Sequence, residues 1–71
     1  MTMIIQTYRS EIKPELVVQR ITYGTVKSWI VINAAFMQGG QPVVTIYPID
    51  AVYPQQLIEQ NRMVQETEHH G

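Results

Sequence analysis

Residues 26–48 form the stretch that most constrains the fold of this chain of 71 residues. They read VKSWIVINAAFMQGGQPVVTIYP, with apolar and β-branched side chains on both sides of a glycine pair. Valine and isoleucine are stiff at χ1 and pack well on a pleated surface, so they favour a strand over a helix. Gly39 and Gly40 supply the positive φ angles of a two-residue hairpin turn. The stretch therefore predicts two strands, residues 29–37 and 42–47, joined at the glycines.

A turn of that length sets the pairing of the two strands. The predicted pairs are Gln38 with Gln41, Phe36 with Val43, Ala34 with Thr45, and Ile32 with Tyr47. One face then carries Ile30, Ile32, Ala34, Phe36, Val43 and Tyr47, and the other carries Trp29, Val31, Ala35, Met37, Val44 and Ile46. A half-solvated antiparallel strand alternates apolar and polar side chains. Because this ribbon does not alternate in that way, we expect both of its faces to be covered.

A helix over residues 28–36 is the competing interpretation, because periodicity alone does not separate a buried strand from a buried helix. The β-branched triplet Ile30, Val31 and Ile32, together with the nearby glycines, favours the strand.

Two shorter strands are predicted before the ribbon. The first covers residues 3–8 and has Met3, Ile5 and Thr7 on one side, with Ile4 and Tyr8 on the other. The second is Leu16–Tyr23, which has Val17, Gln19, Ile21 and Tyr23 on one face, with Leu16, Val18, Arg20 and Thr22 on the other. Between them lies a polar connector in which Pro14 excludes a continuing helix.

The pattern changes after the ribbon. Pro48 ends the last strand because it has no N–H for the ladder. Asp50 is a candidate helix cap, and Pro54 suits the first helical position. A helix is predicted over residues 55–65, with Leu57, Asn61 and Val64 on one side and Ile58 adjacent. Acidic residues sit poorly at a helix C-terminus, so we expect fraying there and a disordered tail over residues 67–71, after a single domain of residues 1–66.

The predicted fold is mainly β, in the α+β class. It is a small antiparallel sheet, or an open SH3-like barrel, of about four strands with one C-terminal helix. One helix covers one face of such a sheet, so the other face needs barrel curvature or a second subunit.

Composition supports a second subunit. A chain of this size buries only about 60% of its unfolded surface and is marginal alone. Charged residues make up 15% of the sequence, below the roughly 25% of a typical domain. Low charge on strands that are apolar on both faces predicts a homo-oligomer, foremost a two-fold dimer.

Several motifs contain residue types that serve in catalysis or metal binding. His69 and His70, near Glu66 and Glu68, suggest a loose divalent-metal site, but a solvated tail is the simpler interpretation. Asp50 has no second carboxylate in the strand region to form an acid–base pair. The glycine pair lacks the lysine and hydroxyl that follow in a phosphate-binding loop, and there is no cysteine. We therefore expect no enzyme activity, no cofactor and no metal.

Basic and aromatic side chains in the first half suggest a surface for single-stranded nucleic acid. The set comprises Arg9, Lys13, Arg20 and Lys27 with Tyr8, Tyr23 and Trp29. A net charge of −1 argues against a partner held by its phosphates. The alternative is that the charges lie on solvated edges and the aromatics in the core. The candidate binding residues taken from this set are Arg20, Tyr23, Lys27 and Trp29.

Residues 44–48 read VTIYP and are followed by Ile49 and Val52. This segment resembles the end of the small SH3-like barrel of plasmid-borne type II dihydrofolate reductases, although Thr45 stands where that family has glutamine. The family is a homotetramer with one central pore, which its Ile-Tyr pair lines. The resemblance adds Tyr47 to the candidate binding residues, and it implies a symmetric pore-type small enzyme as one possible function.

The function predicted first is a non-enzymatic interaction or regulatory protein that acts as a homo-oligomer through a β-sheet surface. Its partners would be a second copy of itself and, beyond that, another protein. The alternatives are a nucleic-acid-binding β-module and the pore-type enzyme. The longest apolar run is too short to span a membrane, and residues 1–10 lack the pattern of a signal peptide, so the expected location is cytoplasmic.

Overall fold

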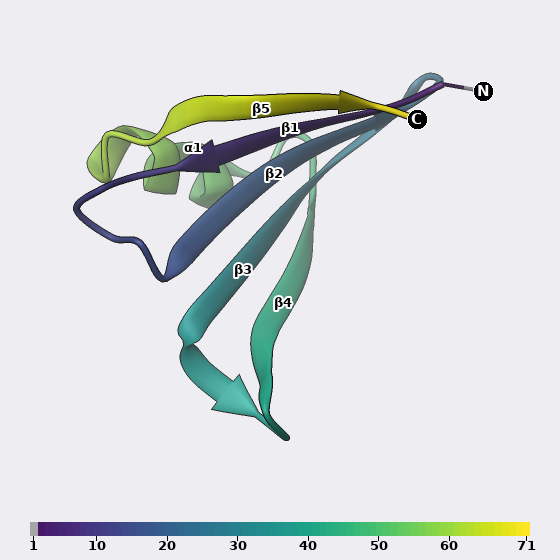
Figure 1. Cartoon of the computed structure of the whole chain (residues 1–71). Helices are drawn as coiled ribbons and strands as arrows, with labels where there is room; N and C mark the ends of the chain where they lie inside the picture. The colour runs from purple at the N-terminus through teal and green to yellow at the C-terminus, as the bar shows by residue number, and fades with distance from the viewer. Residues whose placement is uncertain (1) are drawn as a thin grey trace.

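The computed structural model describes residues 2–71 and shows one open antiparallel sheet with a single helix packed on it (Figure 1). The elements in chain order are β1 (Met3–Arg9), β2 (Leu16–Tyr23), β3 (Val26–Gln38), β4 (Gln41–Pro48), α1 (Val52–Gln60) and β5 (Val64–His70). The strands lie in the order β4-β3-β2-β1-β5. The predicted mainly β fold is confirmed as an open sheet, and it has five strands.

The turn between β3 and β4 lies at the predicted glycines. Gly39 and Gly40 have φ angles of 59° and 79°, which residues that carry a Cβ rarely adopt. Gln38 pairs with Gln41 as expected, and Met37 pairs with Pro42. Strand rather than helix is therefore confirmed for this ribbon.

Further from the turn, the predicted register is wrong. The next pair after Met37–Pro42 is Asn33–Val43. Between these two pairs the position changes by four residues in β3 but by only one residue in β4. Three residues of β3, numbers 34–36, therefore bulge out without a partner. The Asn33 side-chain oxygen accepts a hydrogen bond from the backbone N–H of Ala35 at 2.9 Å, which stabilises the bulge locally.

An odd number of extra residues exchanges the two faces of the strand. The predicted pairs Phe36–Val43, Ala34–Thr45 and Ile32–Tyr47 are replaced by Asn33–Val43, Val31–Thr45 and Trp29–Tyr47. Ile30 and Ile32 now lie opposite Ile46 and Val44. Each face remains largely apolar, but with different members from those predicted.

Helix α1 begins earlier than predicted. Its N-cap is Ala51, with extended backbone and no side-chain cap, so the expected Asp50 cap is wrong. Pro54 is the third helical residue, which also needs no N–H bond within the helix, and its side chain is fully buried. The first turn of the helix therefore has a buried ring and no polar side-chain cap.

Helix α1 also ends earlier than predicted, in a Schellman motif. Asn61 is the C-cap, and Arg62 has a left-handed φ of 51°. The Met63 N–H donates to the Ile58 carbonyl at 2.9 Å, and the Arg62 N–H donates to the Glu59 carbonyl at 3.4 Å. This turn reverses the chain and directs it back along the sheet.

Strand β5 follows that turn and pairs antiparallel with β1. It corrects two expectations: the helix does not reach residue 65, and residues 67–70 are strand rather than disordered tail. Backbone bonds between Met3 and Gly71, at 3.1 and 2.8 Å, close the far end of the pairing. The sequence did not predict this turn because arginine, and not the usual glycine, stands at the left-handed position.

The core lies between the sheet and α1. Its buried side chains are Leu16, Val18, Trp29, Val31 and Met63, and those packed against them are Tyr8, Tyr47, Ile49, Leu57 and Ile58. The Trp29 indole N–H donates to the Ile49 carbonyl at 3.0 Å, which ties β3 to the segment that leads into α1. All of the strand residues in this core share one face of the sheet.

Candidate interaction surface

The other face of the sheet, here called the open face, has no helix packed on it, since α1 packs on the core side of β2 and β3 (Figure 1). Residues directly opposite each other in antiparallel strands share a face, so the strand register shows which residues belong to the open face. They include Met3 and Ile5 of β1, Val17, Ile21 and Tyr23 of β2, Val26, Ile30 and Ile32 of β3, and Val44 and Ile46 of β4. This face carries an apolar group on every one of the first four strands.

Exposure is greatest toward the β4 edge and the β2–β3 turn. Ile46 is 70% exposed, Val26 is 66% exposed and Val44 is 56% exposed. The central members, such as Ile21 and Ile30, are half-buried. A contiguous apolar patch of this kind is typical of an interaction site.

Little charge lies on the open face. Arg9 stands at its β5 corner, with its Nε 3.3 Å from Glu66 Oε2, and His69 lies opposite Ile5. The other polar members are neutral: Thr7, Gln19, Ser28 and Thr67. Gln19 Nε2 donates to the Thr7 hydroxyl at 3.3 Å, so this polar pair is satisfied within the sheet.

The structure divides the five candidate binding residues between the two faces. Arg20, Trp29 and Tyr47 lie side by side on the helix side, in a row across β2, β3 and β4. Lys27 lies on the same side in the next row, opposite Thr22. Tyr23 lies on the open face and is 46% exposed. The five therefore do not form one basic aromatic surface.

Trp29 is enclosed by its own chain. The Arg20 guanidinium carbon lies 5.9 Å from the centre of the indole, the Tyr8 ring lies 6.3 Å away, and Trp29 is only 6% exposed. Among residues 2–71, no hydrogen-bond acceptor reaches the buried Nε of Arg20. A ring packed in this way is a core side chain, and it has no free face on which a nucleic-acid base can stack.

Tyr47 is likewise a packing residue. Its ring lies 5.5 Å from that of Tyr53 on α1, with the planes tilted by 50°. Ile46, its neighbour in the segment that resembles the pore strand, points to the opposite face. The two residues that would line a pore therefore serve different sides of the sheet.

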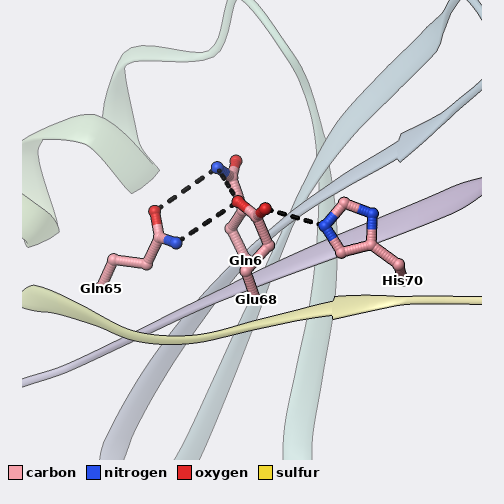
Figure 2. Close-up of polar contacts among 4 residues, drawn as sticks. All are labelled: Gln6, Gln65, Glu68 and His70. Carbon is pink, nitrogen blue, oxygen red and sulfur yellow. Dashed lines mark hydrogen bonds and ion pairs between the residues drawn. The ribbon is translucent and has the colours of Figure 1, made fainter.

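A polar network on the helix side was not predicted from the sequence (Figure 2). Glu68 accepts a hydrogen bond from Gln6 Nε2 at 3.0 Å, and its other oxygen lies 2.8 Å from His70 Nε2. Gln65 Nε2 also approaches Glu68, at 3.4 Å. These bonds, that from His70 foremost, lower the pKa of the Glu68 carboxyl. Since Gln6 lies on β1 and the other three on β5, the network ties the last strand to the sheet.

The two histidines do not act as a pair. His69 lies opposite Ile5 on the open face, and His70 lies opposite Ile4 on the helix side. Neighbouring residues of a strand point to opposite faces, so one metal ion does not reach both rings in this strand. Within residues 2–71 there is no group of three or more histidine, cysteine, aspartate or glutamate side chains placed to hold a metal.

One open pocket, of about 700 Å³, lies beside the β1–β2 loop. Two arginines and two glutamates line it: Arg9, Arg62, Glu11 and Glu66. Its charges balance, and one of its arginines is already paired with one of its glutamates. The pocket thus selects no ligand charge, and the open face is the stronger candidate.

Comparisons of this chain with protein-family models, with curated proteins and with solved structures found no match. Within residues 2–71, no helix has both the length and the apolar character needed to cross a membrane.

Proposed function

We propose that this protein is a non-enzymatic interaction protein that acts as a homodimer, with the open face as its interface. The observation that carries the proposal is a sheet face that is apolar over four strands, nearly free of charge and uncovered by any other part of residues 2–71. The helix side supplies the core of each subunit, and the open face supplies the contact between subunits.

Energetics favour such pairing. Covering about 300 Å² of apolar surface on each copy, at about 25 cal/mol per Å², is worth about 15 kcal/mol for the pair as an upper estimate. Association costs roughly 4–15 kcal/mol in lost freedom. A 71-residue domain has a small core, so the net gain matters for its stability.

A two-fold dimer fits the charge of this face. In an isologous interface a residue close to the two-fold axis meets its own copy, so a charge there meets a like charge. The neutral centre of the open face avoids that penalty, because its polar members are a glutamine, a serine and two threonines.

The test uses two neighbouring residues of β4. Ile46 lies on the open face and Thr45 on the helix side, and both side chains are exposed. Sedimentation equilibrium should show a dimer for the wild type and for Thr45→Asp, and a folded monomer for Ile46→Asp. A wild-type protein that stays monomeric up to millimolar concentration, with a melting temperature independent of concentration, would overturn the proposal.

A further inference from the structure

The β3–β4 hairpin extends past the rest of the sheet (Figure 1). Pairing between β2 and β3 ends at Leu16 and Asn33, and one further backbone bond joins Ala34 to Glu15. Residues 34–42, here called the arm, therefore have strand neighbours only within the hairpin itself. A two-stranded ribbon of this kind is at best marginally stable in water without further contacts.

The arm continues the open face. Strand β4 has no bulge, so Pro42 lies on the same side as Val44 and Ile46. Met37 lies directly opposite Pro42 and joins that side. Had β3 continued without the three extra residues, Met37 would have pointed to the helix side. Because of the bulge, the apolar surface of the open face continues to Met37 and Pro42, close to the hairpin turn.

The arm presents its apolar side chains to solvent in the single chain. Phe36 is 68% exposed and Met37 is 55% exposed. No charged residue occurs between Ser28 and Ile49, so the arm and the parts of β3 and β4 next to it carry no charge. An uncharged arm with an aromatic and a methionine fits an uncharged apolar surface, and the open face of a second copy is such a surface.

The size of the interface points the same way. Five strands about 4.8 Å apart, each contributing about six residues of 3.3 Å, give the open face a footprint of roughly 500 Å². A stable interface of standard size buries about 800 Å² on each partner. The arm is the remaining uncovered apolar element of the ribbon, so covering it adds to the area that the open face offers.

We propose that the arm of each subunit lies across the open face of its partner, with Phe36 and Met37 as the anchoring side chains. This inference rests on the proposed homodimer and specifies how the two copies hold each other. By two-fold symmetry, each subunit packs its arm on the open face of its partner and receives the partner's arm on its own open face.

The chain has no cysteine, so Gln38→Cys, next to the two anchoring side chains, introduces a unique thiol for a nitroxide spin label. Spin-labelled protein is mixed with wild-type protein whose isoleucine methyl groups carry ¹³C. Broadening between subunits should reach methyl groups of the open face, such as Ile21, Ile30 and Ile46. The methyl groups of Ile49 and Ile58, which pack in the core, serve as internal controls.

A second measurement avoids the label. Phe36→Ser should weaken the dimer about 10–100-fold without unfolding the subunit, as truncation of an anchoring aromatic does at an interface. Gln38→Ser, a matched change at the exposed and polar end of the arm, should leave the dimer dissociation constant unchanged.

The outcomes separate the two proposals. A dimer without broadening at the open-face methyl groups, or with Phe36→Ser as tight as wild type, overturns the arm and leaves the homodimer standing. Broadening confined to residues 41–48 of the partner indicates pairing of β4 edges and also overturns the arm. Absence of a dimer in the wild type overturns both proposals.

Discussion

The two faces of the sheet come from the same strands but differ in how they are covered. Leu16 and Val18 point toward α1 and are 2% and 0% exposed, whereas Val17 between them points to the open face and stays partly exposed. Similar apolar side chains thus form a core on one side and an uncovered surface on the other. Apolar side chains on a strand therefore do not by themselves form a core. A core forms on the face that has a helix to cover it, and residues 2–71 have one helix for two apolar faces.

The largest expected effect contrasts Leu16 with its neighbour. Leu16→Ala should lower the free energy of unfolding by about 2–4 kcal/mol, because it leaves a cavity in the packed core. Val17→Ala should cost about 1 kcal/mol or less in the monomer, because half-exposed groups lose less on truncation. Urea unfolding at a protein concentration below the dimer dissociation constant measures both. Equal losses would show that the two faces are equally buried within one chain.

A smaller effect concerns the turn that seats Met63 in the core and starts β5. Arg62→Gly should raise the free energy of unfolding by about 0.5–1 kcal/mol, because glycine adopts the left-handed conformation without steric cost. Arg62→Ala keeps the Cβ and should bring no such gain. Thermal unfolding of the three proteins gives the comparison, and a loss of stability in the glycine variant would contradict the assigned turn.

The smallest effect lies on the helix side beyond the core, where polar contacts hold β5. The pKa of Glu68 in the folded protein is lowered from its ordinary value of 4.5, first by the bond from His70. Its carboxylate therefore stabilises the fold above pH 4.5, and that contribution is lost as the pH falls through the lowered pKa. Melting temperatures between pH 6 and 3 should fall less steeply for Glu68→Gln than for wild type. Glu11→Gln should follow the wild-type curve. A Glu68→Gln curve identical to that of wild type would show that the Glu68 network does not stabilise β5.

Much of the sheet was predictable because its information is local. The period of two in Leu16–Tyr23 correctly separated Val17, Ile21 and Tyr23 from Leu16 and Val18. The glycine pair correctly placed the hairpin turn. The presence of apolar side chains on both faces also followed from the ribbon alone, since it depends on composition and not on register.

The candidate site was predicted less well. A pattern of basic and aromatic residues grouped Tyr23 with Arg20 and Trp29, although their positions in the strands put them on opposite faces. The Glu68 network gave no local signal, because Gln6 and Glu68 lie far apart in the chain and meet only when β5 pairs with β1.

The sequence by itself determined where the first four strands lie, where the chain turns back at glycines, and that more apolar surface exists than one helix covers. Only the tertiary structure decided the three-residue bulge at 34–36, the left-handed turn at Arg62 and the fifth strand. The physical reason is that strand propensity and side-chain alternation act between near neighbours. Register and edge pairing instead depend on backbone hydrogen bonds between segments that are distant in the chain.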